Sequence, residues 1–204
     1  MLSYSQLETA QSTVAAVRPE DEQRVLDTLT CAFTVDPPCR WMYPDATHYR
    51  RNFPVFAMAF GGAAIVEGSA LMSREGDGVA LWLAPGSAPD EDALVRLIER
   101  SVPDHRRGDV FALFAEMSRQ HPLEPHWYLP LIGVVPARQG LGIGAALLRP
   151  VLEVCDAAQL PAYLEATSPK SVPLYRRHGF EPVGEINASG CPPIVPMLRS
   201  PASH

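Results

Sequence analysis

Apolar positions follow two spacings along the chain, and these spacings predict strands that alternate with helices. Short apolar runs bounded by turn residues, which are typical of strands, occupy residues 14–18, 70–74, 79–83, 127–135, 162–166, 181–186 and 194–198. Apolar residues three and four positions apart, which are typical of helices, predict helices over residues 19–33, 47–60, 91–100, 110–120, 142–158 and 172–178. This alternation predicts an α/β fold in which helices cover a mixed sheet.

Prolines and glycines mark where these elements end. Residues 34–44 contain three prolines and are predicted to form a loop. The run Glu75-Gly76-Asp77-Gly78 predicts a hairpin turn, and the charged residues 103–108 predict a connection between helices. Pro54 indicates a later start for the helix over 47–60, and Pro150 predicts a kink or a freed carbonyl in the helix over 142–158.

Length and composition limit the classes of protein that remain. A chain of 204 residues without repeats predicts one domain over residues 14–200 after a flexible extension over 1–13. The net charge of −6 argues against general nucleic-acid binding. Residues 1–13 lack the features of a signal peptide, and the apolar stretch 53–66 is too short to span a bilayer. We therefore expect a soluble cytoplasmic protein without a membrane partner.

The four cysteines show neither metal-ligand spacing nor a disulfide framework. We expect reduced thiols, some of them buried, and no metal site. Cys39, next to two prolines, is the candidate for an exposed thiol. The cysteines are Cys31, Cys39, Cys155 and Cys191.

The candidate chemistry centres on glycines that follow the strand over 127–135. Gly140, Gly142 and Gly144 alternate just before a helix, so backbone N–H groups and the helix dipole form a hollow that suits a phosphate. No Gly-Lys-Ser/Thr follows, which excludes a Walker A loop. The Gly-x-Gly-x-Gly spacing also fits a dinucleotide fingerprint poorly.

Two segments resemble the GNAT family of N-acetyltransferases. Residues 139–144, Gln-Gly-Leu-Gly-Ile-Gly, resemble the Gln/Arg-x-x-Gly-x-Gly/Ala loop that binds the pyrophosphate of acyl-CoA in that family. Residues 175–180, Tyr-Arg-Arg-His-Gly-Phe, resemble its Tyr-x-x-x-Gly-Phe segment. Residues 126–199 are most similar to the puromycin N-acetyltransferase branch, and the first 125 residues share only its layout. The resemblance implies a single-domain GNAT fold, acetyl-CoA as cosubstrate and an amine acceptor, and it allows a homodimer.

The resemblance also implies the residues that hold the cosubstrate. The glycine loop would cradle the pyrophosphate while Leu141 and Ile143 turn into the core, and Arg138 would either screen the phosphates or remain solvated. The strand before the loop would pair with the pantetheine arm, where Gly133 indicates either close approach of a ligand or a bulge. Ser168 either contacts this arm or caps the following helix. The candidates are Ile132, Gly133, Val134, Val135, Arg138, Gln139, Gly140, Leu141, Gly142, Ile143, Gly144, Ala145, Ser168, Ser171 and Tyr175.

Two residues are the candidates for acid–base catalysis. Family members carry a tyrosine at the position of Tyr175 that protonates the leaving thiolate, and free tyrosine is protonated at pH 7. Many members place the base on the strand before the loop, but residues 127–135 contain no acid. Glu165 is the candidate for the base instead. Its other two possible roles are to anchor the substrate ammonium or to accept a hydrogen bond from a backbone N–H.

Five aromatic side chains are open to two interpretations. They either line an acceptor pocket or have ordinary core and surface positions. They are Trp41, Tyr43, His121, His126 and Tyr128.

The sequence thus predicts acetyl transfer to a primary amine of a small molecule or peptide by direct attack in a ternary complex. No cysteine or serine with a partnered base indicates an acyl-enzyme. A non-catalytic acyl-CoA sensor on the same scaffold is the alternative. The identity of the amine stays open at this point.

Overall fold

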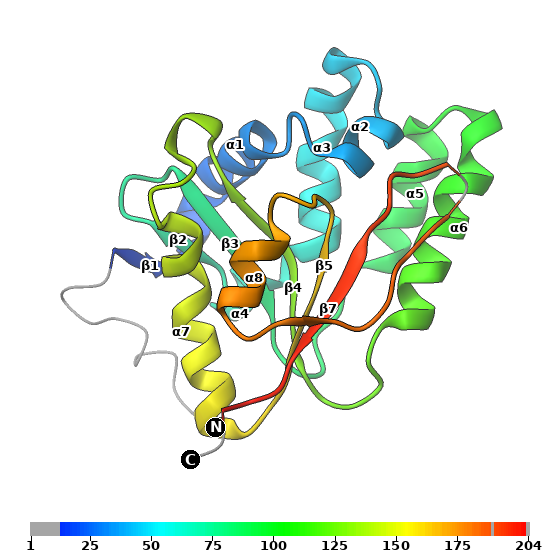
Figure 1. Cartoon of the computed structure of the whole chain (residues 1–204). Helices are drawn as coiled ribbons and strands as arrows, with labels where there is room; N and C mark the ends of the chain where they lie inside the picture. Colours follow the sequence, from blue (N-terminus) through cyan, green and yellow to red (C-terminus); the bar gives the residue numbers. More distant parts are fainter. Residues whose placement is uncertain (1–12, 189, 203–204) are drawn as a thin grey trace.

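The computed structural model, which describes residues 13–188 and 190–202, has a seven-stranded sheet at its centre (Figure 1). The strand order is β1-β2-β3-β4-β5-β7-β6. Only β4 and β5 pair in parallel, and the other neighbours are antiparallel. The strands are β1 Val14–Ala16, β2 Leu71–Ser73, β3 Gly78–Leu83, β4 Trp127–Val134, β5 Ala162–Ala166, β6 Glu181–Pro182 and β7 Val195–Arg199.

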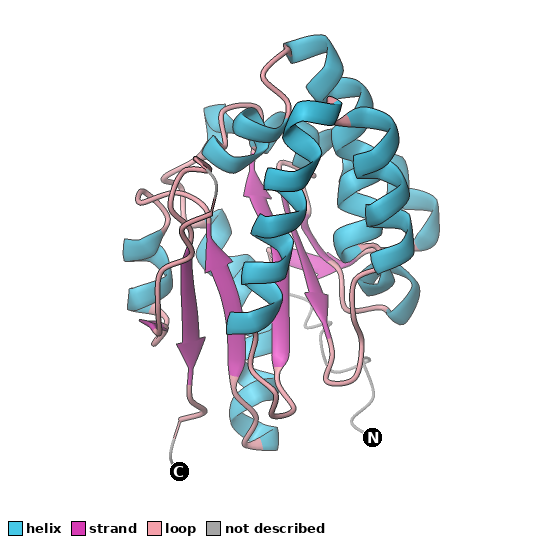
Figure 2. Ribbon diagram, turned by 90° about the vertical axis from the view of Figure 1, so that its right-hand side faces the viewer, coloured by secondary structure: helices cyan, strands magenta, loops and turns pink. Residues whose placement is uncertain are grey.

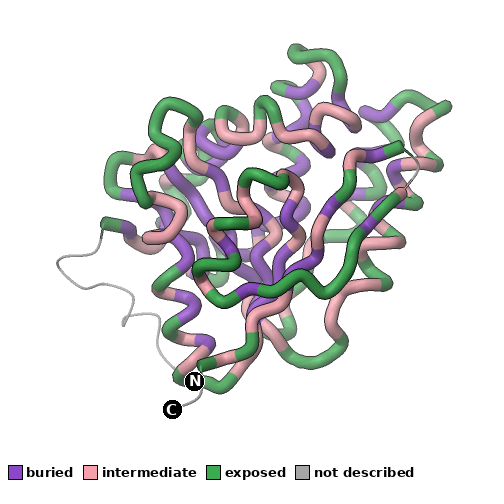
Figure 3. Tube along the Cα trace, in the orientation of Figure 1, coloured by how far each residue is buried: buried purple, intermediate pink, exposed green. Residues whose placement is uncertain are grey.

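Helices cover both faces of this sheet, and the strands run between them in Figure 2. On one face, α1, α3, α5 and α6 share a core with Tyr128, Leu131 and Tyr163. On the other face, α7 and α8 pack on Leu129 and Leu164. Figure 3 shows the buried centre between these layers. The helices are α1 Glu22–Ala32, α2 Pro37–Met42, α3 Ala46–Gly61, α4 Ala63–Glu67, α5 Glu91–Ser101, α6 Asp104–Gln120, α7 Ile143–Ala158 and α8 Val172–Arg177.

The parallel strands β4 and β5 separate soon after they start to pair. Their register covers only Trp127–Leu129 against Ala162–Leu164. Next along β4 comes Pro130, beside an irregularity in the β3–β4 register between Leu81 and Leu83. Proline has no N–H for a ladder and is tolerated at a bulge. The rest of β4 stays paired with β3, so the sheet opens between β4 and β5 toward the carboxyl ends of both strands.

Most predicted elements are confirmed, with boundaries shifted by a few residues. The expected mixed sheet with helices on both faces is observed, and the hairpin turn at 74–77 joins β2 to β3. The predicted strand over 181–186 was too long, because beyond Pro182 only an isolated bridge from Ile186 to Ile194 remains. Helix α4 was not predicted. The predicted extension lies outside the described residues except for Thr13.

The prediction of a loop over residues 34–44 was wrong, because α2 begins at Pro37. Pro37 and Pro38 occupy the first turn, where an N–H has no helical acceptor and its loss costs nothing. The Asp36 carboxylate caps the helix and accepts a hydrogen bond from the Cys39 N–H at 3.1 Å. Cys39 is buried, against the expected exposure.

Two further expectations about helix starts were wrong. Pro54 lies inside α3, which begins at Ala46 because Asp45 accepts a hydrogen bond from the N–H of His48 at 2.7 Å. The charged residues 104–108 are the first turns of α6 rather than a connection. None of the helices in the described residues is both long and apolar enough to cross a membrane.

Candidate functional site

The loop from β4 to α7 forms an open, glycine-lined turn. Gly140 has φ 79° and Gly142 has φ 83°, which is the left-handed region that favours glycine. A Cβ built on either residue would meet no atom within 4 Å. The 16-residue helix α7 starts directly after Gly142, without a side-chain cap. Open space, unhindered backbone and the positive end of a helix dipole together fit a pyrophosphate group.

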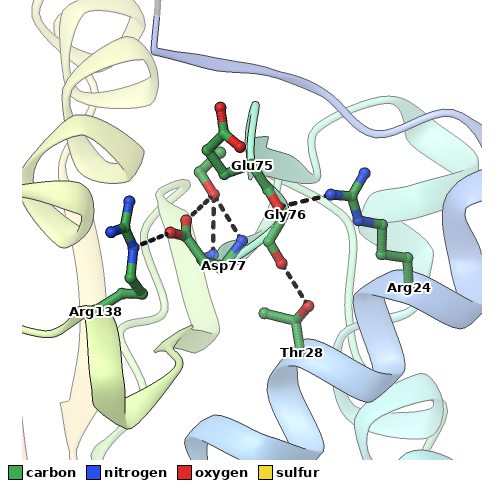
Figure 4. A network of polar contacts seen from close by, with 8 residues as sticks. Arg24, Thr28, Glu75, Gly76, Asp77 and Arg138 are labelled. Carbon is green, nitrogen blue, oxygen red and sulfur yellow. Dashed lines mark hydrogen bonds and ion pairs between the residues drawn. The ribbon is translucent and has the colours of Figure 1, made fainter.

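Polar contacts hold this loop against the β2–β3 turn (Figure 4). The Arg138 Nε donates to Asp77 Oδ2 at 2.8 Å, and the Val135 N–H donates to the Asp77 carbonyl at 2.9 Å. Hydrogen bonds to Asp77 from Ser73 first, and then from Arg138, lower the pKa of its carboxyl. Arg138 is therefore not simply solvated, because it pairs with Asp77. Half of its side chain remains exposed.

The α1 helix holds the same turn from its other side. The Arg24 Nη2 donates to the Glu75 carbonyl at 2.6 Å, and the Thr28 hydroxyl donates to the Gly76 carbonyl at 2.8 Å. On the loop itself, the Gln139 side chain donates to the Val134 carbonyl at 3.0 Å. The glycine loop is thus held by the β2–β3 turn, and α1 supports that turn from its other side.

One expectation about a side chain near this loop was wrong. Leu141 does not turn into the core, because 62% of it is exposed at the tip of the loop. Ile143, the first residue of α7, packs in the core as expected. For Gly133 the structure adds a packing reason to the two that the sequence predicted. A Cβ there would lie 2.7 Å from the Ala32 Cβ and 3.2 Å from the Phe33 ring, so the glycine allows α1 to pack on β4.

The remaining loop candidates occupy the first turn of α7 and the open stretch of β4. Gly144 faces α8, since a Cβ there would lie 3.1 Å from Leu174 Cδ2. Ile132 and Val134 are partly buried on the α7 face. Ala145 and Val135 are also partly buried. This stretch of β4 follows the last residue that pairs with β5.

Tyr175 lies on α8, against the α7 face of the sheet. It is 6% exposed and its ring meets Phe180 edge-on, with 6.1 Å between centroids. Burial raises the pKa of its hydroxyl to about 12, the Ser171 side chain lowers it in part, and the charge of Asp36 raises it. The hydroxyl is therefore protonated throughout the physiological pH range and can donate a proton.

The two serine candidates lie at the start of α8. Ser171, rather than Ser168, has the N-cap position, although its side chain makes no capping bond. Its hydroxyl donates to the Ser168 carbonyl at 2.8 Å. The Ser168 hydroxyl accepts a long bond from the Lys170 N–H at 3.3 Å. The interpretation of Ser168 as the helix cap was therefore wrong.

Asp36 is the site residue that sequence reasoning missed. Its Oδ2 accepts a hydrogen bond from the Thr167 hydroxyl at 2.5 Å, which ties the start of α2 to the end of β5. Burial raises the pKa of its carboxyl, while the bonds from Thr167 and Cys39 lower it. The sequence analysis predicted a loop here. The place of Asp36 before two prolines is the signal that could have identified a helix cap, but nothing in the sequence linked it to Tyr175.

Glu165 points to the opposite face of the sheet from Tyr175. It follows Leu164, the last residue of β5 that pairs with β4, and its side chain is only 4% exposed. Burial and then the charge of Glu165 raise the pKa of both the Tyr128 and the Tyr163 hydroxyls. The side chain of Glu165 also interacts by hydrogen bonding with both hydroxyls.

Two histidines extend from Glu165 toward the surface. His126 Nδ1 lies 2.7 Å from the Glu124 carbonyl and so donates to it, and burial lowers the pKa of this ring. The neutral ring then accepts at Nε2 from His121 Nε2, at 2.9 Å. The Nδ1 of His121 is left facing Glu165 Oε1 at 3.8 Å. Both imidazoles thus lie against Tyr163, on the same face of the sheet as Glu165.

The other aromatic candidates divide between pocket and core. Tyr128 and His121 line a cavity with Glu165. Tyr43 is buried in the core with its hydroxyl 2.8 Å from Ser101 Oγ. Trp41 packs beside that core, under the Arg106 guanidinium, which lies 6.0 Å from its ring centroid.

The fold therefore brings most of the candidates to one place, the gap between β4 and β5. The glycine loop lies at the end of β4, Tyr175 flanks the α7 face, and Glu165 flanks the α3 face.

Comparisons with known proteins define the class. The model of the acetyltransferase (GNAT) family matches residues 81–180, which include both predicted motifs. An uncharacterised N-acetyltransferase of Schizosaccharomyces pombe is 26% identical over 178 residues, 80% of this chain and 72% of that protein. A crystal structure described as histone acetyltransferase HPA2 and related acetyltransferase, from Corynebacterium glutamicum, is 29% identical with a TM-score of 0.67. It covers 94% of this chain and 97% of the other.

Residues 81–180 thus match the GNAT family of N-acetyltransferases, and the chain has the fold of that family. It is an enzyme, so the alternative of a non-catalytic sensor is set aside. Enzymes of this family use acetyl-CoA and transfer its acetyl group to an amine.

Proposed function

We propose that this enzyme binds acetyl-CoA at the glycine loop and transfers the acetyl group to a primary amine of a small molecule, by direct attack in a ternary complex. The observation that carries the proposal is the opening between β4 and β5, which starts beside Glu165 and ends at the loop. Acetyl-CoA, when bound, supplies an acetyl group already activated as a thioester.

The residues proposed to hold the cosubstrate follow from this arrangement. The backbone of residues 139–145 suits the pyrophosphate, because Gly140 and Gly142 border open space and α7 begins directly after them. The backbone of residues 132–135 continues β4 beyond its pairing with β5 and suits the amide groups of the pantetheine arm. Ser168 and Ser171 flank that arm from the start of α8.

The two proton transfers of the reaction take place on opposite faces of the gap. Glu165 accepts a proton from the bound ammonium group, which leaves the neutral amine to attack the thioester, and the His121 and His126 rings pass this proton toward the surface. Tyr175 donates a proton to the departing thiolate from the opposite face. This division supplies the neutral amine and the protonated leaving group that the reaction requires.

The similarity to the puromycin branch depends on residues 161–169 and 173–175, and it stays a prediction. The cytoplasmic location and the homodimer also stay predictions.

A thermal-shift titration tests the cosubstrate directly. We expect acetyl-CoA to raise the Tm in a saturable way while NAD and ATP leave it unchanged. At a hundredfold excess over Kd, ligand binding stabilises a protein by about 2.7 kcal/mol. For a chain of this size, that free energy corresponds to a rise of roughly 5–10 °C. A shift with NAD or ATP and none with acetyl-CoA would refute the assignment of the loop.

Gly142 allows a matched test of charge at the loop. Asparagine and aspartate both tolerate a positive φ and have nearly the same shape, so Gly142→Asn and Gly142→Asp differ mainly in charge. We expect the aspartate variant to bind acetyl-CoA at least about tenfold more weakly than the asparagine variant, because a carboxylate within a few ångströms of the pyrophosphate repels it.

Calorimetric titration of both variants measures this difference. The same pair at Gly68, where φ is 77° and the space is equally open, provides the control. Equal affinities of Gly142→Asn and Gly142→Asp for acetyl-CoA would contradict a pyrophosphate site at the loop.

A further inference from the structure

A cavity of about 510 Å³ lies on the α3 face of the sheet, between α3, α5, α6 and the loop that follows α6. Its walls are mainly apolar and aromatic side chains, which include Phe60, Leu94, Ile98, Phe111, Phe114 and Met117. The volume is in the range of small-molecule sites. An apolar body is therefore favoured in this space.

The charged groups of the cavity all favour a cation. Glu165 and Glu91 are the carboxylates among its lining residues, which include no arginine or lysine. Glu91 is exposed at the start of α5, whereas the Glu165 side chain is buried at the sheet. Among the residues that the structure describes, the groups found around Glu165 are the His121 ring, whose Nδ1 lies 3.8 Å from Oε1, and the hydroxyls of Tyr128 and Tyr163. The cavity has no lysine or arginine to pair with this buried carboxylate, so the site favours a cationic ligand.

The buried end of the cavity coincides with the gap between β4 and β5. Glu165 comes one residue after Leu164, which forms the last β4–β5 pair with Leu129. Side chains alternate along a strand, so Glu165 shares the α3 face with Tyr163. A positive group bound at Glu165 is thus next to the opening proposed for the thioester.

We propose that the acceptor is a primary amine with an apolar, ring-sized body, which fills this cavity while its single ammonium group lies at Glu165. The proposal rests on the proposed function, because it identifies the acceptor of the same reaction. A polyamine or an aminosugar fits poorly, since its additional charges or hydroxyls would be desolvated against apolar walls without hydrogen-bond partners.

A kinetic assay of thiol release tests the proposal. The acetyl-CoA concentration is held fixed, and the acceptors are 2-phenylethylamine, ethylamine and spermidine. We expect kcat/KM for 2-phenylethylamine to exceed that of the other two amines by about 10- to 100-fold, which is what burial of one phenyl group provides.

Two exposed valines give a matched pair of variants. Val95 on α5 lines the cavity and is 42% exposed, whereas Val55 on α3 is 39% exposed and is not among the lining residues. We expect Val95→Lys to raise KM for 2-phenylethylamine at least about tenfold with a smaller change in kcat, because the added cation repels the ammonium. Val55→Lys should change neither parameter.

The outcomes separate the two proposals. Efficient turnover of spermidine or ethylamine but not of 2-phenylethylamine, or equal effects of the two lysine variants, would overturn the pocket assignment and leave acetyl transfer standing. Absence of thiol release with every amine, despite a thermal shift with acetyl-CoA, would overturn the pocket and the proposed function together.

Discussion

The Tyr175→Phe variant is expected to lose roughly 10²- to 10⁴-fold in kcat, the contribution typical of a positioned general acid. Burial keeps the pKa of this hydroxyl near 12, so at neutral pH the group holds a proton that it can give to the leaving thiolate. Phenylalanine keeps the contact with Phe180 and removes only the oxygen. Acetyl-CoA binding, measured by thermal shift, should therefore stay within a few-fold of the parent enzyme.

Tyr43→Phe is the control for this variant. Tyr43 is also buried, and the variant also loses one hydroxyl contact, but this contact is to Ser101 of α5 in the core. We expect it to lower the free energy of unfolding by about 1 kcal/mol and to keep kcat. If Tyr175→Phe changed kcat no more than Tyr43→Phe does, Tyr175 would have a packing role only.

The Glu165→Gln variant is expected to lose about 10²- to 10⁴-fold in kcat at pH 7. Glutamine keeps the size of the side chain in its buried place but cannot accept the ammonium proton. Turnover should then depend on the small fraction of amine that is already neutral. For an amine with a lysine-like pKa of about 10.4, this fraction rises tenfold per pH unit. The deficit should therefore shrink steadily between pH 7 and pH 10.

The pH series also distinguishes a base from a simple anchor. An anchor would raise KM in Glu165→Gln and leave kcat largely intact, with no recovery at high pH. Glu91→Gln removes the exposed carboxylate of the same cavity and should change kcat by less than twofold. Equal pH profiles for the parent enzyme and Glu165→Gln would rule out proton transfer through this residue.

Local patterns were sufficient for the glycine loop. Gly140 and Gly142 have the positive φ that their spacing before a helix indicated, because this backbone conformation depends on the residue type itself. The order of strands and helices was likewise readable from apolar spacing. The prediction over residues 34–44 failed because proline breaks a helix interior but is accommodated in its first turn, where Pro37 and Pro38 lie.

Contacts between distant segments were beyond the reach of sequence patterns. Gly133 is small because Ala32 of α1 packs on it, and no spacing within β4 carries that information. Arg138 pairs with Asp77, 61 residues earlier. Asp36 meets Thr167 across 131 residues. Each of these contacts depends on how the elements pack, so a motif could identify neither partner.

The sequence by itself determined the elements, the glycine loop and the family resemblance, because these follow from local backbone preferences and short-range spacing. Only the tertiary structure decided that β4 and β5 separate after Leu129, and that Tyr175 and Glu165 lie on opposite faces of the resulting gap. It alone also placed an apolar cavity with one buried carboxylate beside that gap. The physical reason is that a site of this kind is formed by side chains from many elements, whose meeting depends on the packing of the whole sheet and its helices.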